Sequence, residues 1–145
     1  MRQRNGKYNA QKSELDGIKF DSKAELNYYC HLKELKTQGV VSWFDMQPEF
    51  TLLGGFTDDF GRKHLPIKYR ADFLVHYTDA PPVVIDIKGM ETPDFKLKRK
   101  MYCARFPLEL KLIAYSKIDG GWIETDELKK ARKLRKKAKE AKLNG

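Results

Sequence analysis

Two charged residues, Asp86 and Lys88, interrupt the most apolar stretch of the chain, "VVIDIKG" at residues 83–89. The surrounding Val and Ile residues predict a β-strand that is covered on both faces. Because a strand alternates its faces, the two charged side chains point the same way, roughly 7 Å apart along the strand. An acid on the inner face of a core strand is costly unless it has a partner. This strand is therefore a candidate for carrying chemistry.

A second acid, Asp72, lies in the segment 67–78, whose residues alternate along what we predict to be one continuous strand. The alternation places Tyr69 and Phe73 on one face of this strand and Asp72 on the other. The residues "DAPP" that follow are typical of a turn, so the two strands should pair antiparallel. Asp72 and Asp86 then share one face near the same end of the sheet.

Two carboxylates on one face of a sheet require compensation. At ~4 Å they repel each other by about 4 kcal/mol when the effective dielectric is about 20, so the pair needs a proton or a cation. No Cys or His cluster accompanies the two aspartates, and hard oxygen ligands favour Mg²⁺ or Mn²⁺ over Zn²⁺. The sequence therefore predicts a divalent-metal site.

Glu25 is the candidate for a third acid. The run from Ser22 to Glu25 has the pattern of a capping box, in which the Glu25 carboxylate reaches back to the start of a helix. However, Glu25 also precedes Tyr28 and Tyr29 at helical spacing and so heads the apolar stripe of that helix. A capping glutamate does not need this face. The pattern favours an inward, functional Glu25, with capping as the alternative.

The remaining patterns predict an α/β fold, in which a mixed central sheet is flanked by helices on both faces. A strand, a helix and a strand within about 30 residues imply a right-handed crossover and a parallel strand pair. Segment 54–66 gives no clear pattern. Cap signals, apolar spacing and a break near Pro48 predict helices over about residues 22–38, 92–106 and 125–143, and strands over about residues 40–53, 67–78, 83–88 and 108–116.

Positive charge is concentrated at the two ends of the chain, which has a net charge of +9. We expect a basic, flexible segment over residues 1–16, a core domain over 17–124 and a basic helix over 125–145. Such ends can bind a polyanion by counterion release, although a solvated tail is the alternative. The candidate DNA-binding residues in the last helix are Lys129, Lys130, Arg132, Lys133, Arg135, Lys136 and Lys137.

Cys30 and Cys103 are the two cysteines, and both lie in predicted helices. This arrangement suits a reduced, cytosolic protein better than a disulfide scaffold. No apolar run approaches the length of a membrane span, and the first residues lack the apolar core of a signal peptide. We therefore expect a cytoplasmic protein that does not bind a membrane.

The order of the candidate residues resembles the PD-(D/E)XK nuclease superfamily. Glu25 lies in a first predicted helix, Asp72 in a strand, and Asp86 and Lys88 form an Asp-x-Lys motif in the next strand. More narrowly, "MQPEFTLL", "YRADF", "IDIKG" and "DFKLKRKMY" resemble a small phage-encoded branch of it, catalogued mainly as a domain of unknown function. The resemblance covers roughly residues 20–116 and implies a restriction-endonuclease-like core. Ala71 stands where this superfamily often has a proline, and Asp86 where Glu is commoner; the motif permits both.

The resemblance implies a role for each matching residue. Asp72, Asp86 and the backbone carbonyl of Ile87 would bind Mg²⁺, for which Mn²⁺ should substitute, and Glu25 would complete the metal shell directly or through water. Lys88 would orient the attacking water and offset charge on the phosphate. Two further polar residues are candidates around this site: Lys98, or its neighbours Lys96 and Lys100, and Gln47, which precedes Pro48. The alternative interpretation for both is an exposed or capping side chain without a role in the site.

The function implied is a Mg²⁺-dependent DNA endonuclease that hydrolyses phosphodiester bonds. Backbone contacts to DNA with little base readout are expected, and junction- or branch-selective cleavage and a homodimer remain open. If the chain is phage-encoded, it would act in the cytosol of a bacterial host. The alternative is a non-catalytic nucleic-acid-binding or phage assembly protein that keeps a nuclease-like fold. The intact set of Glu25, Asp72, Asp86 and Lys88 favours the enzyme.

Overall fold

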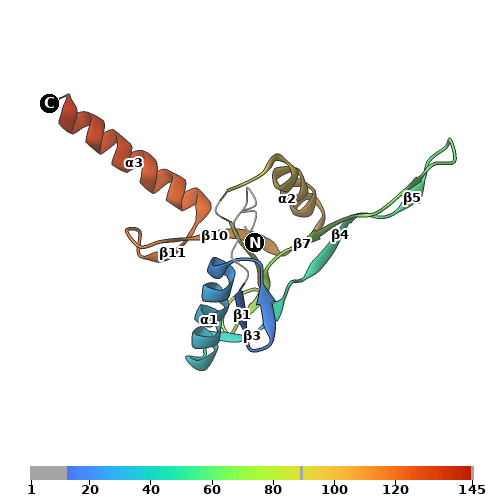
Figure 1. Cartoon of the computed structure of the whole chain (residues 1–145), viewed down its shortest axis with the longest axis horizontal. Helices are drawn as coiled ribbons and strands as arrows, with labels where there is room; N and C mark the ends of the chain where they lie inside the picture. Colours follow the sequence, from blue (N-terminus) through green and yellow to red (C-terminus); the bar gives the residue numbers. More distant parts are fainter. Residues whose placement is uncertain (1–12, 89, 145) are drawn as a thin grey trace, which may run out of the picture.

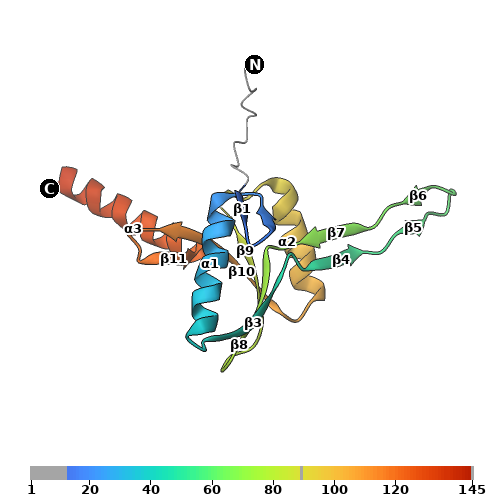
Figure 2. The ribbon, with the colours of Figure 1, turned by 60° about the horizontal axis from the view of Figure 1, so that its bottom comes forward.

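A five-stranded mixed sheet forms the centre of the computed structural model, which describes residues 13–88 and 90–144 (Figure 2). The strands β3, β8 and β9 form an antiparallel meander, β10 runs parallel to β9, and β11 pairs antiparallel with β10. This topology confirms the predicted antiparallel pair and the parallel crossover. In sheet order the strands are β11 (Gly121–Glu124), β10 (Glu109–Ser116), β9 (Val83–Ile87), β8 (Phe73–Tyr77) and β3 (Val41–Met46).

Helix α1 (Lys23–Thr37) covers one face of this sheet. Ser22 caps the helix, because its side-chain oxygen accepts a hydrogen bond from the Glu25 backbone N–H at 3.1 Å. The apolar stripe predicted from the sequence faces inward and packs against β3, β8 and β9. This first core contains Tyr28, Tyr29, Leu32, Val41, Phe73, Val75, Val83 and Ile85.

Helix α2 (Pro93–Arg105) covers the opposite face and begins at the predicted Thr92 cap, whose hydroxyl accepts from the Phe95 N–H at 3.1 Å. The two cores use alternate residues of β9, as expected for a strand buried on both faces. The second core contains Tyr69, Ala71, Val84, Phe95, Tyr102, Leu110 and Leu112. The molecule is thus a mixed α/β fold consistent with a restriction-endonuclease-like architecture, as predicted.

The continuous strand predicted over residues 67–78 is wrong. Strand β7 (Ile67–Arg70) ends before Ala71 and Asp72, and β8 begins at Phe73. Across this break the faces reverse, so Tyr69 packs in the second core with α2 whereas Phe73 packs in the first core with α1. The simple alternation had put both residues on one face.

A long hairpin arm projects from the body on the side opposite the C-terminal helix (Figure 1). Its base is the pair β4 (Glu49–Leu53) and β7, and its outer part is the pair β5 (Phe56–Thr57) and β6 (Lys63–His64). Segment 54–66, which had no interpretable pattern, is therefore the outer arm. Phe60 and Leu65 on it are 91% and 87% exposed.

Residues 13–20 form a small hairpin of β1 (Ser13–Leu15) and β2 (Ile18–Phe20), which joins the first core through Phe20. The last four residues of the predicted flexible segment 1–16 are thus β1 and the turn after it. The remaining part of that segment, with its basic residues, lies outside the described residues.

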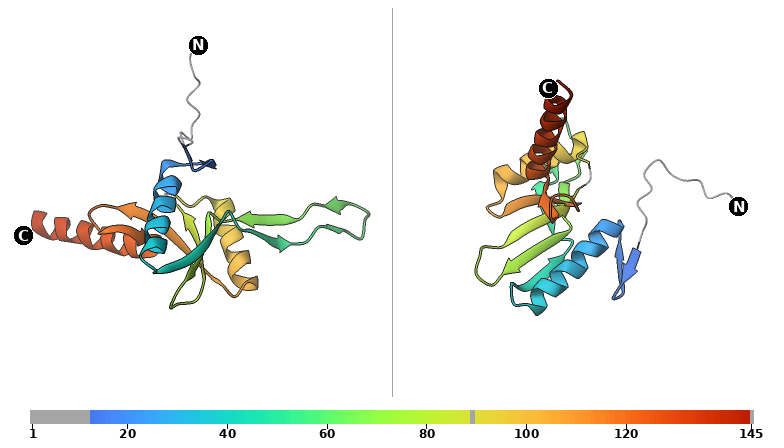
Figure 3. Two further views of the ribbon diagram at one scale, coloured as in Figure 1. Left: turned by 90° about the horizontal axis from the view of Figure 1, so that it is seen from below. Right: turned by 90° about the vertical axis from the view of Figure 1, so that its left-hand side faces the viewer.

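Helix α3 (Thr125–Leu143) follows β11, a strand that the sequence did not predict, and extends away from the sheet (Figure 3). Leu128 is buried near its start, and Arg135 donates hydrogen bonds of 2.6 and 3.2 Å to the Asp119 carboxylate. Cys30 and Cys103 are exposed free thiols. Within residues 13–88 and 90–144, no helix combines the length and the apolar character needed to cross a membrane.

Candidate active site

The break between β7 and β8 is matched by a break between β3 and β4 at the same level. Pro48 has no N–H to donate, and Gln47 adopts a left-handed backbone conformation with φ of 50°. Two cross-strand hydrogen bonds join the breaks: Gln47 N–H to the Asp72 carbonyl at 2.9 Å, and Ala71 N–H to the Pro48 carbonyl at 3.1 Å. The hairpin thereby changes faces at this level, and Asp72 lies at the seam between the two cores.

Asp72 and Asp86 come together at this seam, as the sequence predicted. The antiparallel β8–β9 register pairs Phe73 with Ile85. Asp72 precedes Phe73 and Asp86 follows Ile85, so the two aspartates lie at the next position of this register. The Asp72 carboxylate accepts a hydrogen bond from the Ile87 N–H at 2.7 Å. Burial, a hydrogen bond with Asp86 and the charge of Asp86 together raise the pKa of Asp72 to about 9. The pair therefore holds a proton near neutral pH unless a cation compensates it.

Asp86 is the one buried charged residue of the described chain, with 2% of its surface exposed. The Tyr69 hydroxyl donates a hydrogen bond to Asp86 Oδ2, and the same oxygen lies 3.5 Å from Lys88 Nζ. Burial and then the Asp86 charge raise the pKa of Tyr69, so its hydroxyl stays a proton donor. Sequence reasoning missed Tyr69, because the reversal of faces at residues 71–72 has no local signal.

Lys88 lies just beyond the end of β9 and points to the same side as Asp86, as predicted. Its N–H donates to the Ile113 carbonyl at 3.0 Å, which fixes the backbone against β10. Its ammonium lies 4.4 Å from the centre of the Phe95 ring, within the range of a cation–π interaction. Phe95, the first buried residue of α2, was not predicted to support the site. Together, Asp86 and Phe95 hold the lysine charge at the C-terminal end of the central strand β9.

Glu25 lies in the first turn of α1, and its carboxylate is half-buried. Its backbone N–H is capped by Ser22, and its carboxylate accepts from the backbone of Asp21. Burial and the Asp21 charge, with a smaller contribution from Asp86, raise the pKa of Glu25, whereas Lys88 lowers it. Glu25 thus lies within electrostatic range of the site. Across residues 13–88 and 90–144, no three or more His, Cys, Asp or Glu side chains already form a metal-holding group.

The two additional polar candidates differ in their positions. Gln47 adjoins the site through its backbone bond to Asp72. Lys98 instead forms an ion pair with Asp94 on its own helix, at 3.7 Å. Its neighbour Lys96 lines a hollow beside α3 together with Lys88 and Lys129. Of the three lysines considered on α2, Lys96 is the one that shares the lining of a hollow with Lys88.

A cleft of about 300 Å³ opens from the end of β9 toward α3 and contains Lys88, Tyr115, Thr125, Lys129 and Arg132 among its lining residues. Two of the seven predicted DNA-binding residues, Lys129 and Arg132, therefore face the candidate site. The other five predicted residues have other surroundings. Lys130 pairs with Glu127, and Arg135 pairs with Asp119. The remaining three are exposed: Lys133, Lys136 and Lys137.

The raised pKa of Asp72 predicts how the stability of the metal-free protein depends on pH. The pKa is 3.8 in an unfolded chain and about 9 in the fold, so the folded state binds the extra proton. The contribution of this proton to the stability of the fold is fully present below pH 3.8 and is lost as the pH rises through about 9. In EDTA, Asp72→Asn should therefore flatten the fall in Tm over this range, as measured by thermal denaturation. Asp45→Asn on β3 is the matched control; equal slopes in wild type and Asp72→Asn would contradict the assignment.

Comparison with known proteins gives one match. No curated protein and no solved structure matches the chain. A family model described as "Protein of unknown function (DUF1064)" matches residues 5–126. The match includes α1, α2, the central sheet and all four candidate site residues, and it ends within the first turn of α3. The chain therefore belongs to the DUF1064 family of proteins of unknown function.

Proposed function

We propose that this chain is a metal-dependent DNA endonuclease of the PD-(D/E)XK type, which hydrolyses phosphodiester bonds. The observation that carries the proposal is the arrangement of Asp72, Asp86 and Lys88 at one end of β9. Two acids share a partly buried seam, and a lysine lies 3.5 Å from one of them. A purely structural core has little reason to hold two adjacent carboxylates, because their repulsion opposes folding.

The carboxylate pair fits a divalent cation. Mg²⁺ is usually held by one or two carboxylates and keeps several of its own waters, which agrees with two acids and no completed third ligand. Asp72 and Asp86 would hold the ion, with the Ile87 carbonyl and Glu25 as further oxygen donors. When bound, Mg²⁺ would supply a more acidic water and positive charge beside the phosphate oxygens. Mn²⁺, which also prefers oxygen ligands, should substitute.

The side chains around the pair have separable roles in this proposal. Lys88 would hold its ammonium beside the phosphate, where negative charge increases in the transition state. Tyr69 fixes the orientation of the Asp86 carboxylate through the hydrogen bond from its hydroxyl. Glu25 lies on α1 and Phe95 on α2, so in this proposal the two helices would border the reacting phosphate from different sides.

The substrate proposed is DNA, bound mainly through its phosphates. Lys129 and Arg132 on α3 line the same cleft as Lys88, so positive charge continues outward from the candidate site. We propose a cytosolic location because two exposed free thiols suit a reducing compartment. Partners other than DNA are not required by this arrangement.

Nicking of supercoiled plasmid tests the proposal directly. The wild-type protein should convert supercoiled DNA to open circles with Mg²⁺ or Mn²⁺, and EDTA should stop the reaction. Agarose gel electrophoresis over time gives the rate. Binding to the plasmid without nicking under any metal condition would instead favour a non-catalytic nucleic-acid-binding protein with a nuclease-like fold.

The placement of Lys129 and Arg132 predicts a specific salt dependence. Exchanging both for Gln should make the negative slope of log association constant against log salt concentration for duplex DNA shallower by about 2, since each phosphate contact contributes about −0.9. Lys139→Gln with Lys142→Gln removes the same charge from the far end of α3 and is the matched control. Fluorescence anisotropy in EDTA measures both slopes. A slope for the Lys129 and Arg132 double variant equal to that of wild type would mean that the cleft side of α3 does not contact DNA.

A further inference from the structure

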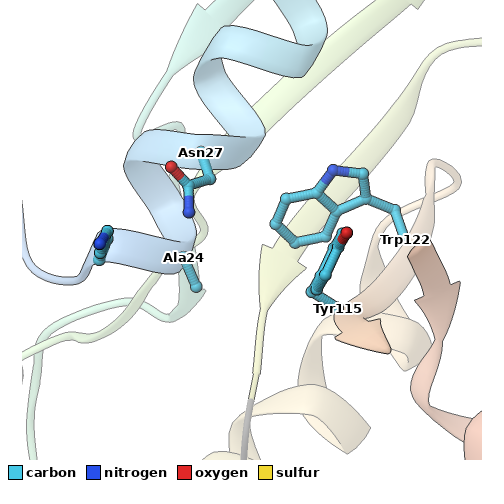
Figure 4. A pocket seen from close by; sticks show the side chains of 5 residues that line it. Ala24, Asn27, Tyr115 and Trp122 are labelled. Atoms are coloured by element: carbon cyan, nitrogen blue, oxygen red, sulfur yellow. The ribbon is translucent and has the colours of Figure 1, made fainter. Parts of the chain in front are cut away.

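A hollow of about 450 Å³ lies beside the candidate site, on the outer side of the α1 start. Figure 4 shows Asn27 and Ala24 of α1 on one side and Tyr115 and Trp122, from β10 and β11, on the other. Lys23 completes the lining. None of these residues belongs to the proposed catalytic set, and the hollow has no role in the function proposed above.

Two aromatic side chains form one wall of this hollow and are held in position by the fold. Tyr115 and Trp122 are direct partners across β10 and β11, with ring centres 5.1 Å apart and planes at 72°. Trp122 also packs edge-on against the buried Tyr28, at 4.9 Å. Tyr115 is 60% exposed, so its ring is accessible to a ligand. The wall therefore offers an oriented π-surface that a flat aromatic ligand can contact.

The opposite side of the hollow is polar. The exposed Asn27 amide carries both a donor and an acceptor, which matches the hydrogen-bonding edge of a nucleobase. Lys23, four residues earlier, adds a positive charge suited to a phosphate. An aromatic wall facing an amide and an ammonium matches the three chemical parts of a nucleotide: a flat base, its polar edge and an anionic backbone.

The hollow adjoins the cleft that contains Lys88. Ala24 and Tyr115 line both spaces. A strand whose phosphate lies between Lys88 and Arg132 can therefore direct a neighbouring base past Tyr115 into the hollow. In a fully paired duplex that base is stacked and paired, and removing it costs a few kcal/mol.

We propose that this hollow binds an unpaired nucleobase next to the cleaved phosphodiester, so that the protein prefers single-stranded or branched DNA over a continuous duplex. The inference rests on the proposed function, because it assumes a DNA strand in the Lys88 cleft. Stacking on aromatic side chains is largely independent of base identity. The preference therefore concerns DNA structure rather than sequence.

Intrinsic fluorescence tests the inference without requiring cleavage. The chain has two Trp residues, so Trp43→Phe leaves Trp122 as the single reporter, and Asp86→Asn prevents turnover. This double variant is titrated in EDTA with an oligothymidylate and with a blunt duplex of equal nucleotide content, while anisotropy records total binding. The oligothymidylate should quench Trp122, and the duplex should bind with little quenching. Equal quenching by both DNAs would overturn the inference.

Substitutions in the hollow provide the second measurement. Tyr115→Ala should weaken binding of the oligothymidylate about tenfold, within the range for loss of one stacked base, and should weaken duplex binding less, because its ring also lines the Lys88 cleft. Asn27→Ala should weaken oligothymidylate binding and leave duplex binding unchanged, because Asn27 lines the hollow but not the cleft. Phe60→Ala, which removes an exposed aromatic on the arm, is the matched control. Unchanged DNA binding by the two hollow variants would overturn the inference. It would also be overturned if sedimentation showed that the variants lose only self-association, because the hollow would then be a contact between two copies of this chain. If the oligothymidylate quenches Trp122 but the wild-type protein does not nick plasmid, the proposed nucleobase site would stand and the proposed nuclease activity would be overturned.

Discussion

Asp86→Asn should abolish metal-dependent DNA cleavage, with a loss of about a thousandfold or more in the single-turnover rate. Asparagine keeps the size of the side chain and can still accept the hydrogen bond from Tyr69, but it removes the charge that would hold the metal beside Asp72. Cleavage of a labelled oligonucleotide in Mg²⁺ measures the rate. Asp45→Asn, a substitution of the same type on the exposed edge strand β3, should change the rate by less than about twofold.

Stability measurements separate this loss of activity from misfolding. Asp86→Asn removes a charge that helps to raise the pKa of Asp72, so folding of the metal-free variant requires less proton uptake at neutral pH, and its Tm should equal or exceed that of wild type. The rise in Tm that Mg²⁺ gives the wild type by binding the folded state should be lost. A variant that nicks DNA at the wild-type rate would contradict the site assignment, as would a wild type whose Tm does not respond to Mg²⁺.

Lys88→Met should lower the single-turnover rate about a hundredfold while changing DNA affinity little. Methionine keeps an unbranched apolar side chain but removes the ammonium, which lies 4.4 Å from the centre of the Phe95 ring and 3.5 Å from Asp86. An interaction made mainly in the transition state affects the rate, whereas one made equally in the bound state affects affinity. Rapid-mixing cleavage at saturating protein and anisotropy with Ca²⁺ in place of Mg²⁺ measure the two quantities.

Lys98→Met is the matched control for this prediction. It removes an equal charge from α2, at a position where the ammonium pairs with Asp94 rather than with the two site aspartates. Its cleavage rate should stay within about threefold of wild type. Equal effects of the two substitutions would mean that net charge, rather than the position of Lys88, supports catalysis.

Local signals were sufficient to predict the helices and the order of the candidate acids. Ser22 and Thr92 cap α1 and α2 where their sequence patterns indicated, and each cap depends on residues within one helical turn. The spacing of Asp86 and Lys88 on one strand also fixes their common direction. For these features the sequence is informative because the determining contacts are short in range.

Long-range contacts decide the features that the sequence could not predict. Tyr69 reaches Asp86 because two hydrogen bonds between distant breaks reverse the faces of the hairpin. Pro48 signals one of these breaks, but the break at residues 71–72 has no local signal of its own. The arm over segment 54–66 is an extension of β4 and β7, although its polar residues do not alternate. Strand β11 is short and depends on pairing with β10. In each case a partner far along the chain supplies the structure.

The seam between the two cores has a consequence for the biosynthesis of this protein. Asp72 lies where the hairpin passes from the first core to the second, while Glu25 belongs to α1 and Lys88 rests on a ring of α2. A chain with only one core assembled therefore lacks part of the constellation. Under the proposed function, a nascent or partly unfolded molecule would be inert toward the DNA of its cell. Hydrolytic competence would arise only with completion of the tertiary structure, a safeguard that needs no inhibitor and no propeptide.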